Sequence, residues 1–247
     1  MADRVSVLTL YQFPISHYCE KARWALDYKH LDYKIRNLLP GLHVLKTKKL
    51  APHASVPILV DDGEAIQGSN KIITYLDEKF PEQSLTPEAD RLKKEALEWE
   101  KYIDTEIGIH VRRCCYQVLL DHPDIVIPFL AHNGPWYGKP LLTIMFPRLK
   151  KKMRAMMNIN EESAQKSREH LEAAIDRVYG QLQKRPFLVG DQFTRADLAA
   201  ASLLAPLCRP KKYGLNWPVR FPDQLEALID EFRGRMDWVH KVYESYR

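Results

Sequence analysis

The chain has 247 residues, of which 45% are hydrophobic and 28% are charged, a balance typical of folded proteins and not of disordered ones. Its formal net charge is only +5 and its densest basic run, residues 148–154, is short, so we do not expect it to bind nucleic acid. No stretch approaches the roughly 20 apolar residues that span a bilayer, and the four cysteines fit neither a zinc-ligand spacing nor a disulfide framework. These features predict a soluble cytoplasmic protein with no stable membrane insertion and no metal site.

Short segments, whose apolar period changes from one to the next, fill residues 5–80. Expected strands cover residues 5–10, 33–39, 57–60 and 64–66, and expected helices cover residues 19–28, 41–50 and 69–80. Asp61, Asp62 and Gly63 stand between the last two strands and predict a tight hairpin turn. The order β-α-β-α-β-β-α is typical of a small α/β domain.

The composition changes after Pro81. Two prolines and several polar residues within residues 81–90 are typical of a linker. Beyond it, apolar residues recur with the period of a helix, and we expect helices over residues 92–107, 164–182, 194–206 and 221–246. The sequence therefore predicts an α/β domain in residues 1–82, a linker in residues 83–90 and an all-α domain in residues 91–247.

Residues 133–160 contain four of the six methionines of the chain. A stripe at helical spacing runs along this segment, formed by Leu142, Met145, Leu149, Met153 and Met156. Pro147 falls within the stripe and should begin or kink the helix. Ordinary helix packing is the favoured interpretation of the stripe, and an adaptable apolar pocket is the alternative.

Residues 13–26, FPISHYCEKARWAL, place a serine and a cysteine three positions apart where an expected strand gives way to a helix. The run PISHYC (14–19) resembles the active-site stretch of serine-type cytosolic glutathione transferases. Three further runs resemble, in the family's order, its cis-proline strand, its glutathione-binding turn with the following helix, and its helical-domain signature: SVPIL (55–59), IQGSNKIITYLDEKFP (66–81) and FLVGDQFTRADL (187–198). The chain is therefore similar to this superfamily across most of its length.

The resemblance implies a glutathione transferase fold, with a thioredoxin-like N-terminal domain and an all-α C-terminal domain. It also implies a homodimer and a transferase that uses glutathione as a substrate without a cofactor, with small apolar electrophiles as second substrates, as in detoxification. By position, the implied glutathione-binding residues are Ser16, His53, Val56, Pro57, Gly68, Ser69 and Asn70. Tyr18, Met145 and Met153 are expected at the electrophile.

Ser16 is the expected catalytic residue. A free thiol has a pKa of about 8.5. Lowering this pKa by about two units requires roughly 2.7 kcal/mol of preferential stabilisation of the thiolate. A hydroxyl that donates a hydrogen bond at a helix N-terminus could supply this, because the first amides and the helix dipole favour an anion there. The spacing alone favours a plain N-cap for Ser16, and the family resemblance reverses that preference.

Two other residues compete with Ser16. Cys19 could act as a glutaredoxin-like monothiol if it were exposed and its pKa were lowered, but a place one turn into the helix favours a buried structural cysteine. Tyr11 is a strand-end tyrosine, yet alignment with tyrosine-type transferases puts their catalytic position at Gln12, on the opposite face of the strand. Packing is therefore expected for Tyr11.

Departures from the family pattern leave a third interpretation open. Many transferases have Glu or Gln at the position of Gly68, where it binds the γ-glutamyl ammonium, and many have Lys or Gln at the position of Ser55. These departures favour a non-catalytic transferase-fold protein that binds apolar ligands or a partner. Thr194 and Asp197 are expected to form a capping box, and Arg23 is expected to support the scaffold.

Overall fold

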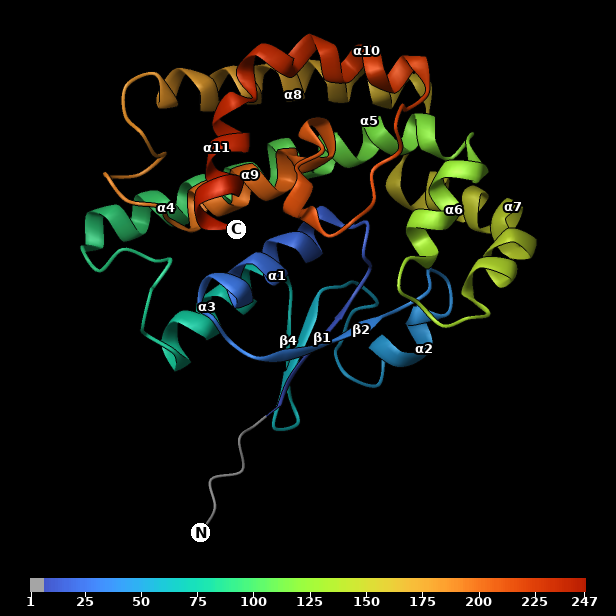
Figure 1. The fold of residues 1–247 in the computed structure, drawn as a ribbon, viewed down its shortest axis with the longest axis horizontal. Coiled ribbons are helices and arrows are strands. Elements are labelled where there is room, and N and C mark those ends of the chain that lie inside the picture. The colour runs from blue at the N-terminus through green and yellow to red at the C-terminus, as the bar shows by residue number, and fades with distance from the viewer. Residues whose placement is uncertain (1–6) are drawn as a thin grey trace.

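A mixed four-stranded sheet forms the centre of the N-terminal domain, with the strand order β2-β1-β3-β4 (Figure 1). Its strands are β1 (Leu8–Gln12), β2 (Tyr33–Asn37), β3 (Ile58–Asp61) and β4 (Glu64–Gln67). β1 pairs with β2 in parallel, and β3 pairs antiparallel with both β1 and β4. The computed structural model describes residues 7–247, so Val5 and Ser6 of the first expected strand lie outside the described residues.

The β3–β4 hairpin turns at Asp62 and Gly63. Both residues have a positive φ, 45° and 89° respectively, which is the conformation that lets a two-residue turn match the twist of its strands. Glycine adopts it without cost because it lacks a Cβ, and aspartate is one of the few other residues that tolerate it. The predicted hairpin is confirmed.

Three helices complete the α/β domain: α1 (His17–Tyr28), α2 (His43–Thr47) and α3 (Ser69–Lys79). The observed order confirms the predicted β-α-β-α-β-β-α pattern. α1 and α3 contact each other and lie between the sheet and the helical domain (Figure 1). Since α1 is covered from both sides, it is buried along most of its length, and Trp24 and Leu26 are fully inaccessible.

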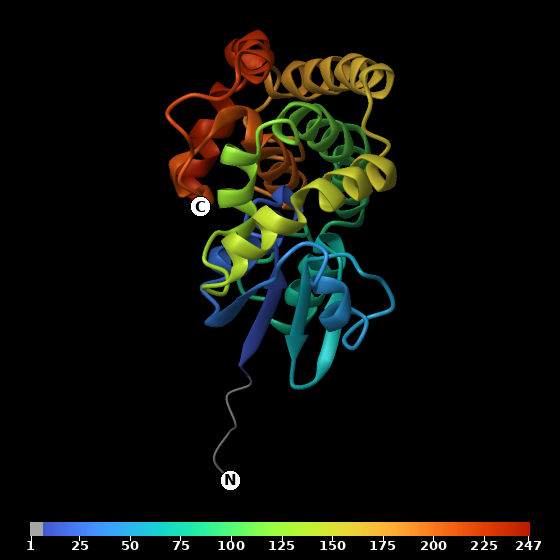
Figure 2. The same cartoon turned by 90° about the vertical axis from the view of Figure 1, so that its right-hand side faces the viewer.

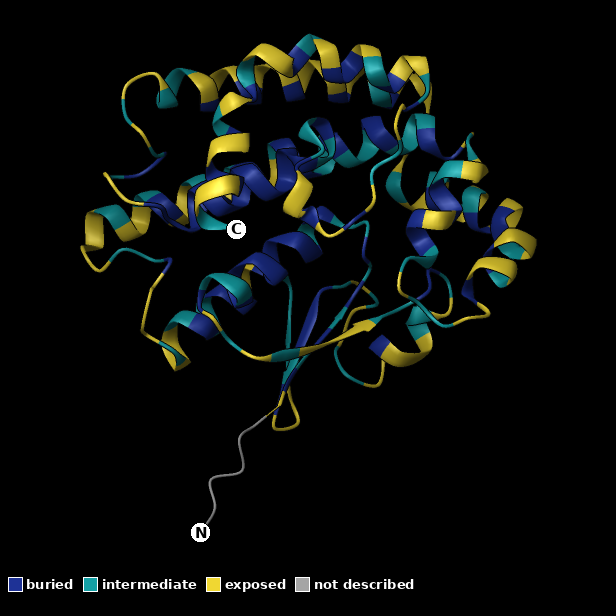
Figure 3. Cartoon of the chain, viewed as in Figure 1, coloured by how far each residue is buried: buried dark blue, intermediate teal, exposed yellow. Residues whose placement is uncertain are grey.

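The second domain is built from helices. They are α4 (Asp90–Ile103), the π-helix η1 (Asp104–Gly108), α5 (Ile109–Leu119), α6 (Pro123–Ala131), α7 (Gly138–Met157), α8 (Glu161–Leu182), α9 (Arg195–Cys208), α10 (Asp223–Phe232) and α11 (Asp237–Tyr246), with 3-10 turns at Lys211–Tyr213 and Arg233–Arg235. α9 is the central helix and is buried at almost every residue, because it contacts α1, α4, α5 and α11 (Figure 3).

Three details of the helical domain differ from the prediction. Neither α5 nor α6 has a counterpart among the expected helices. The expected helix over residues 221–246 is divided by the 3-10 turn at Arg233–Arg235, where Gly234 weakens the helical conformation. Pro147 lies inside α7 and does not begin it, and its neighbours Phe146 and Leu149 are buried, which offsets part of the cost of the missing hydrogen bond.

The α6–α7 pair reaches across to the α/β domain, as Figures 1 and 2 both show. Asn37, at the end of β2, donates a hydrogen bond to the carbonyl of Asn133 at 3.1 Å. Leu39 packs so closely on Gly138 that a Cβ at position 138 would lie 3.0 Å from it. These contacts hold α6 and α7 beside the carboxyl end of β1 and β2.

A buried cluster of charges joins the two domains. The ammonium nitrogen of Lys21 on α1 lies 2.9 Å from a carboxylate oxygen of Glu100 and 2.7 Å from one of Asp104. Arg195, at the start of α9, lies 2.7 Å from the other oxygen of Glu100 and donates to the hydroxyl of Thr74 on α3. The side chains of Lys21, Glu100 and Arg195 are at most 3% exposed, so each charge depends on its partners.

The basic run of residues 148–154 belongs to α7. Lys150 and Arg154 both pair with Asp121, at 2.5 and 2.9 Å, so part of the positive charge of this run is neutralised. Among the helices that the structure describes, none is both long and apolar enough to cross a lipid bilayer.

Candidate functional site

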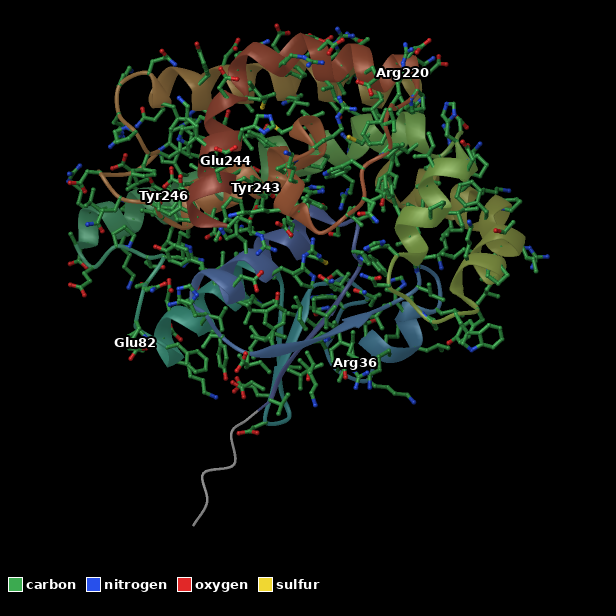
Figure 4. The ribbon with its side chains drawn as sticks, in the orientation of Figure 1. Arg36, Glu82, Arg220, Tyr243, Glu244 and Tyr246 are labelled. Carbon is green, nitrogen blue, oxygen red and sulfur yellow. The ribbon has the colours of Figure 1, made fainter. Side chains whose placement is uncertain are left out.

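A cavity of about 530 Å³ lies between the two domains, at the N-terminus of α1. Residues 13–18, 40–44 and 53–56 of the α/β domain contribute to one wall. The other wall comes from α5, α6 and α7 and from residues 206–225. Side chains of both domains fill the surrounding space between the ribbons (Figure 4). The volume falls within the range of typical small-molecule sites.

Ser16 lies just before α1 and lines this cavity. Its extended backbone (φ −74°, ψ 120°) makes it the N-cap, and its hydroxyl oxygen accepts a hydrogen bond from the N–H of Cys19 at 3.3 Å. A serine hydroxyl has one donor and two acceptor sites, so the cap bond occupies only an acceptor site and the rotatable O–H of Ser16 can turn to donate to a ligand. The helix dipole favours a negative ligand atom at the same point. This arrangement can stabilise an anion such as a thiolate.

Cys19 lies one turn into α1 and is fully buried. Burial raises the pKa of its thiol above the ordinary value of 9.0, although the hydrogen bond with Ser16 opposes that shift. The alternative in which Cys19 acts as a monothiol requires an exposed thiol with a lowered pKa. The structure provides neither condition.

We expect Cys19 to resist alkylation in the folded protein, because its thiolate is scarce and the reagent cannot reach it. Iodoacetamide labelling followed by peptide mass spectrometry should modify position 19 far more slowly in the native chain than in the urea-unfolded chain. A Cys19→Ser variant identifies the peptide. Rapid labelling of Cys19 in the native protein would contradict this prediction and support the monothiol mechanism.

Val56 and Pro57 are joined by a cis peptide bond, as the family resemblance implied. The pairing of β3 with β4 brings them beside Gly68, whose N–H donates to the carbonyl of Pro57 at 3.0 Å. Val56 lines the cavity, and no hydrogen bond to its main chain is found within the described part of the chain. Its N–H and C=O are therefore available to pair with an extended peptide.

Gly68 is the N-cap of α3 and has a φ of 102°, a conformation that residues with a side chain rarely adopt. Ser69 is the first residue of the helix and is buried. Ser69 is therefore not the N-cap of α3, because Gly68 before it takes that position. A glutamate or glutamine at position 68 of this chain would be strained in this backbone conformation.

Asn70 lies away from the cavity. Its side-chain oxygen accepts from the N–H of Lys71 at 2.9 Å, and its carbonyl accepts from Arg195 at 2.9 Å. It lines a separate groove between α3 and α4. Of the expected glutathione-binding residues, three line the cavity: Ser16, His53 and Val56. The other four do not: Pro57, Gly68, Ser69 and Asn70.

Gln67, the last residue of β4, holds the loop that carries His53 and Ser55. Its amide nitrogen donates to the carbonyls of His53 and Ser55 at 2.7 and 2.8 Å, and its amide oxygen accepts from the N–H of His53 at 3.2 Å. This side chain thus positions the loop that leads to the cis bond. Gln67 is absent from the residues expected above, and its one signal in the sequence is a polar residue directly before Gly68.

One end of the cavity is basic. His43, His53 and Lys152 all line it. Burial lowers the pKa of His43, the nearby charge of Lys152 lowers it further, and a hydrogen bond with Ala54 opposes the shift. His43 therefore lies between Lys152 and the loop that carries His53, and this end of the cavity suits a carboxylate.

Two of the three residues expected at the electrophile, Tyr18 and Met153, line the cavity. The hydroxyl of Tyr18 donates to the carbonyl of Asp104 at 2.6 Å, and burial raises its pKa. Met145 is not among the residues that line the cavity, and its Cε lies beside Gly41, which does line it. Met145 and Met153 are eight positions apart, which places them about 80° apart around α7.

Aromatic rings close the cavity on the helical side. Trp217 and Phe221, which follow α9, pack edge-on against Phe129 of α6. All three rings line the cavity. They were not expected there, because the contact joins segments that are far apart in the chain.

The predicted capping box is present at the start of α9. The two oxygens of Asp197 accept from the N–H and the hydroxyl of Thr194, at 2.9 and 2.8 Å, and from the N–H of Leu188 at 2.7 Å. Burial raises the pKa of Asp197 to about 6, and these hydrogen bonds oppose the shift. The pair is structural, as its spacing predicted.

Arg23 and Tyr11 lie outside the lining of the cavity. Arg23 is buried and donates to the side chains of Glu20 and Gln12, so it links α1 to β1. The ring of Tyr11 lies under the ammonium group of Lys46, with 5.2 Å between the nitrogen and the ring centre. These contacts agree with the scaffold and packing roles expected for the two residues.

One group of residues outside the cavity offers metal ligands: Glu106, His110 and His170, whose ligand atoms lie within 4.8 Å of one another. The two imidazole rings stack with their planes only 5° apart. A histidine nitrogen binds a metal ion in the plane of its ring, so two parallel stacked rings cannot share one ion unless a side chain rotates. The cluster is therefore not arranged for metal binding in this conformation.

Two family models match the chain. The model described as glutathione S-transferase, N-terminal domain, matches residues 10–84, and the model described as glutathione S-transferase, C-terminal domain, matches residues 138–239. The chain belongs to the cytosolic glutathione transferase superfamily. The two matches fall on the α/β domain and the helical domain in that order, and they confirm the fold that the short motifs predicted.

Curated proteins that resemble this chain align with it over only part of their own length. Glutathione S-transferase 1 of Dianthus caryophyllus is 41% identical over 96 residues, which is 38% of this chain and 42% of that protein. A stringent starvation protein A homolog of Haemophilus ducreyi is 33% identical over 86 residues, which is 35% of this chain and 40% of that protein. The chain thus matches about two fifths of the length of these relatives.

Solved structures share the whole transferase fold. The beta-etherase LigF of a Sphingobium species is similar to this chain with a TM-score of 0.61, and the similarity covers 97% of this chain and 99% of that one. The two sequences are 23% identical, so this likeness concerns the fold alone.

Proposed function

We propose that this protein conjugates the glutathione thiolate to small apolar electrophiles and that Ser16 stabilises the thiolate. The observation that carries the proposal is the hydroxyl of Ser16 at the N-terminus of α1, at the edge of a cavity between two domains. Membership of the superfamily supports glutathione as the thiol substrate. A donor at this point binds the thiolate more strongly than the thiol, so it lowers the pKa of bound glutathione.

In this proposal glutathione lies extended along the loop before the cis bond, and no cofactor takes part. Its cysteinyl unit pairs with the main chain of Val56, and its thiol reaches Ser16. The γ-glutamyl carboxylate lies at the start of α3, near Ser69, where the helix dipole favours an anion. The glycyl carboxylate lies at the basic end of the cavity, near His53 and Lys152.

The electrophile lies against the helical wall of the cavity. Met153 and the rings of Phe129, Trp217 and Phe221 supply apolar surface there. Methionine adapts to ligands of different shape, because its side chain is unbranched and its sulfur is polarizable. This wall therefore suits a range of small apolar acceptors.

Isothermal titration calorimetry with glutathione is the first test. We expect a dissociation constant between the micromolar and millimolar ranges, and a glutathione conjugate by mass spectrometry when a chromogenic aryl halide is added. Undetectable glutathione binding would instead support the non-catalytic interpretation. The relatives are named both as glutathione S-transferases and as stringent starvation protein A homologues, so superfamily membership by itself does not assign the activity.

We further propose a two-fold homodimer in which α3 and α4 of each chain, with the hairpin turn at Asp62 and Gly63, contribute to the contact. Residues of α3 and α4 line a groove on this face, and Leu97 lies in it with 38% of its surface exposed. The exposed Lys94 and Glu98 lie beside it on α4. A two-fold interface must be self-complementary, and mixed charges around an apolar centre satisfy that requirement.

Light scattering at low micromolar concentration should give about twice the chain mass of 28.8 kDa. Leu97→Arg should shift the protein toward the monomer, because the substitution places a charge at the apolar centre of the contact. Leu45→Arg is the matched control, since Leu45 is an exposed leucine of α2 outside this face. A monomer for the unaltered chain would contradict the dimer but not the role of Ser16, because the cavity lies within one chain.

A cytoplasmic location is also part of the proposal. The cysteines of the structure, Cys19, Cys114, Cys115 and Cys208, are all free. Free thiols are usual in a reducing compartment, whereas secreted proteins tend to pair them.

A further inference from the structure

Arg112, in the first turn of α5, lines the cavity without a protein partner for its charge. Within the described residues, no hydrogen bond or ion pair involves its guanidinium, and its Nε is buried with no protein acceptor. The next residue is different: Arg113 donates to the carbonyl of Met157 and to the hydroxyl of Ser167. A buried donor without an acceptor is costly, so the position of Arg112 needs a reason other than stability.

The groups around Arg112 do not balance its charge. Burial, followed by the charge of Arg112, lowers the pKa of His17 to about 3, so this ring is neutral and its Nε2 donates to the carbonyl of Gly108 at 2.9 Å. Tyr18 and Tyr116 also lie near the guanidinium, and burial raises the pKa of both hydroxyls. Among the described residues, neither aspartate nor glutamate lines the cavity.

The chemistry of arginine defines a complementary ligand. The guanidinium stays charged at every physiological pH and presents its N–H donors in a planar fork. A carboxylate matches this fork with two parallel hydrogen bonds, and the pair is strengthened where water is largely excluded. Arg112 therefore suits a carboxylate better than a neutral apolar group.

The position of Arg112 separates it from the basic end of the cavity. Lys152 lies near His43 and the loop that carries His53, and this is the end assigned above to the glycyl carboxylate. Arg112 lies instead against His17 and Tyr18, on a helix of the domain that supplies the electrophile wall. The charges of Arg112 and Lys152 thus act on different groups of the cavity lining.

We propose that Arg112 binds a carboxylate of the second substrate, so that the preferred electrophile is an apolar molecule that carries a negative group. This inference rests on the proposed function and narrows its substrate class. Arg112 acts as a specificity residue, because it contacts the substrate away from the carbon that glutathione attacks.

Two aryl chlorides that differ in a single group test the proposal. 4-Chloro-3-nitrobenzoate carries a carboxylate, and 4-chloro-3-nitrobenzamide carries a neutral amide of similar size. In both, the thiolate forms a carbon–sulfur bond at the chlorinated ring carbon and chloride leaves. The measured quantity is the kcat/KM for the benzoate divided by that for the benzamide. Comparison of this ratio between protein variants cancels the intrinsic difference in reactivity between the two compounds.

Arg112→Met removes the charge and keeps much of the length of the side chain. It should lower the benzoate-to-benzamide ratio of kcat/KM by about ten- to a hundred-fold, which is the usual effect of losing a hydrogen bond to a charged group. Arg112→Lys should retain part of the preference, because it keeps the charge but loses the fork. Arg36→Met is the matched control and should leave the ratio unchanged. Arg36 is an exposed arginine of the edge strand β2, outside the cavity (Figure 4).

A binding measurement separates this inference from the proposed function. Calorimetry with the non-reactive pair 3-nitrobenzoate and 3-nitrobenzamide, at saturating glutathione, does not require turnover. The natural chain should bind the benzoate more tightly, and Arg112→Met should remove that preference. If no variant conjugates either aryl chloride, the proposed function fails, and this comparison still decides the role of Arg112.

Two results would overturn the inference. One is an unchanged preference for the carboxylate compounds in Arg112→Met. The other is a loss of glutathione affinity in Arg112→Met with the carboxylate preference retained, which would assign the guanidinium to glutathione.

Discussion

Replacing Ser16 with alanine is expected to lower kcat for conjugation by about a hundred- to a thousand-fold at neutral pH, the usual effect of removing one donor from a stabilised anion. The hydroxyl oxygen already accepts from the N–H of Cys19, so the hydroxyl proton is the part that a thiolate uses. Without this hydroxyl proton, the pKa of the thiol of bound glutathione should return toward the value of free glutathione, about 8.5. The deficit should therefore shrink as the pH rises above that value, because the thiolate then forms without help.

The measurement is a pH–rate profile with a chromogenic aryl halide for the natural chain, Ser16→Ala and Ser16→Thr. Threonine keeps both the hydroxyl and the cap, so this variant should retain most of the activity. Alanine removes the cap at a cost of about 1 kcal/mol, and circular dichroism should show that the fold persists. Unchanged turnover in Ser16→Ala at neutral pH would remove Ser16 from the mechanism.

Replacing Glu100 with alanine is expected to reduce the free energy of unfolding by about 3–5 kcal/mol, the usual cost of removing one partner from a buried ion pair. Lys21 and Arg195 both contact this carboxylate, at 2.9 and 2.7 Å, and both side chains are almost inaccessible. Asp104 remains paired with Lys21, but Arg195 would lose the carboxylate that contacts it directly and keep neutral hydrogen-bond partners such as Thr74. The loss should include a weaker attachment of α1 to the helical domain.

Urea unfolding followed by tryptophan fluorescence and by far-ultraviolet circular dichroism measures this effect. The two signals should remain coincident if the domains still unfold together. Glu169→Ala is the control, because Glu169 is an exposed residue in the middle of α8, outside the proposed dimer contact, and its carboxylate accepts from the exposed Gln165 at 3.2 Å. Its effect should stay below about 0.5 kcal/mol. An equally small loss in Glu100→Ala would contradict a stabilising role for the buried cluster.

The α/β domain could be predicted almost completely, because each of its elements has a local signal. Asp62 and Gly63 predicted the turn that their positive φ angles confirm. The helical domain was less predictable. The segment 123–131 that forms α6 is apolar on most sides and contains Pro128, so it has no clear period of apolar and polar residues. Pro147 was expected to begin or kink a helix, and the structure contradicts the first alternative, because this proline lies inside α7.

The candidate site was predictable where a short motif carries it. Ser16 and Val56 belong to such motifs, and both line the cavity. Met145 was selected from a stripe that is wider than the face that meets the cavity, so the periodicity alone could not distinguish it from Met153. Gln67 was missed because its contribution depends on hydrogen bonds to a loop more than ten residues away.

The sequence by itself determined the order of strands and helices in the α/β domain, the cap position of Ser16 and the capping box of Thr194 and Asp197. Each of these depends on residues within a few positions of one another. Only the tertiary structure decided which charges are buried and what they meet: the partner of Glu100 on α9 is 95 positions away, and the buried Nε of Arg112 meets no acceptor among residues 7–247. The reason is that burial and pairing arise from the packing of two domains, which no local spacing encodes.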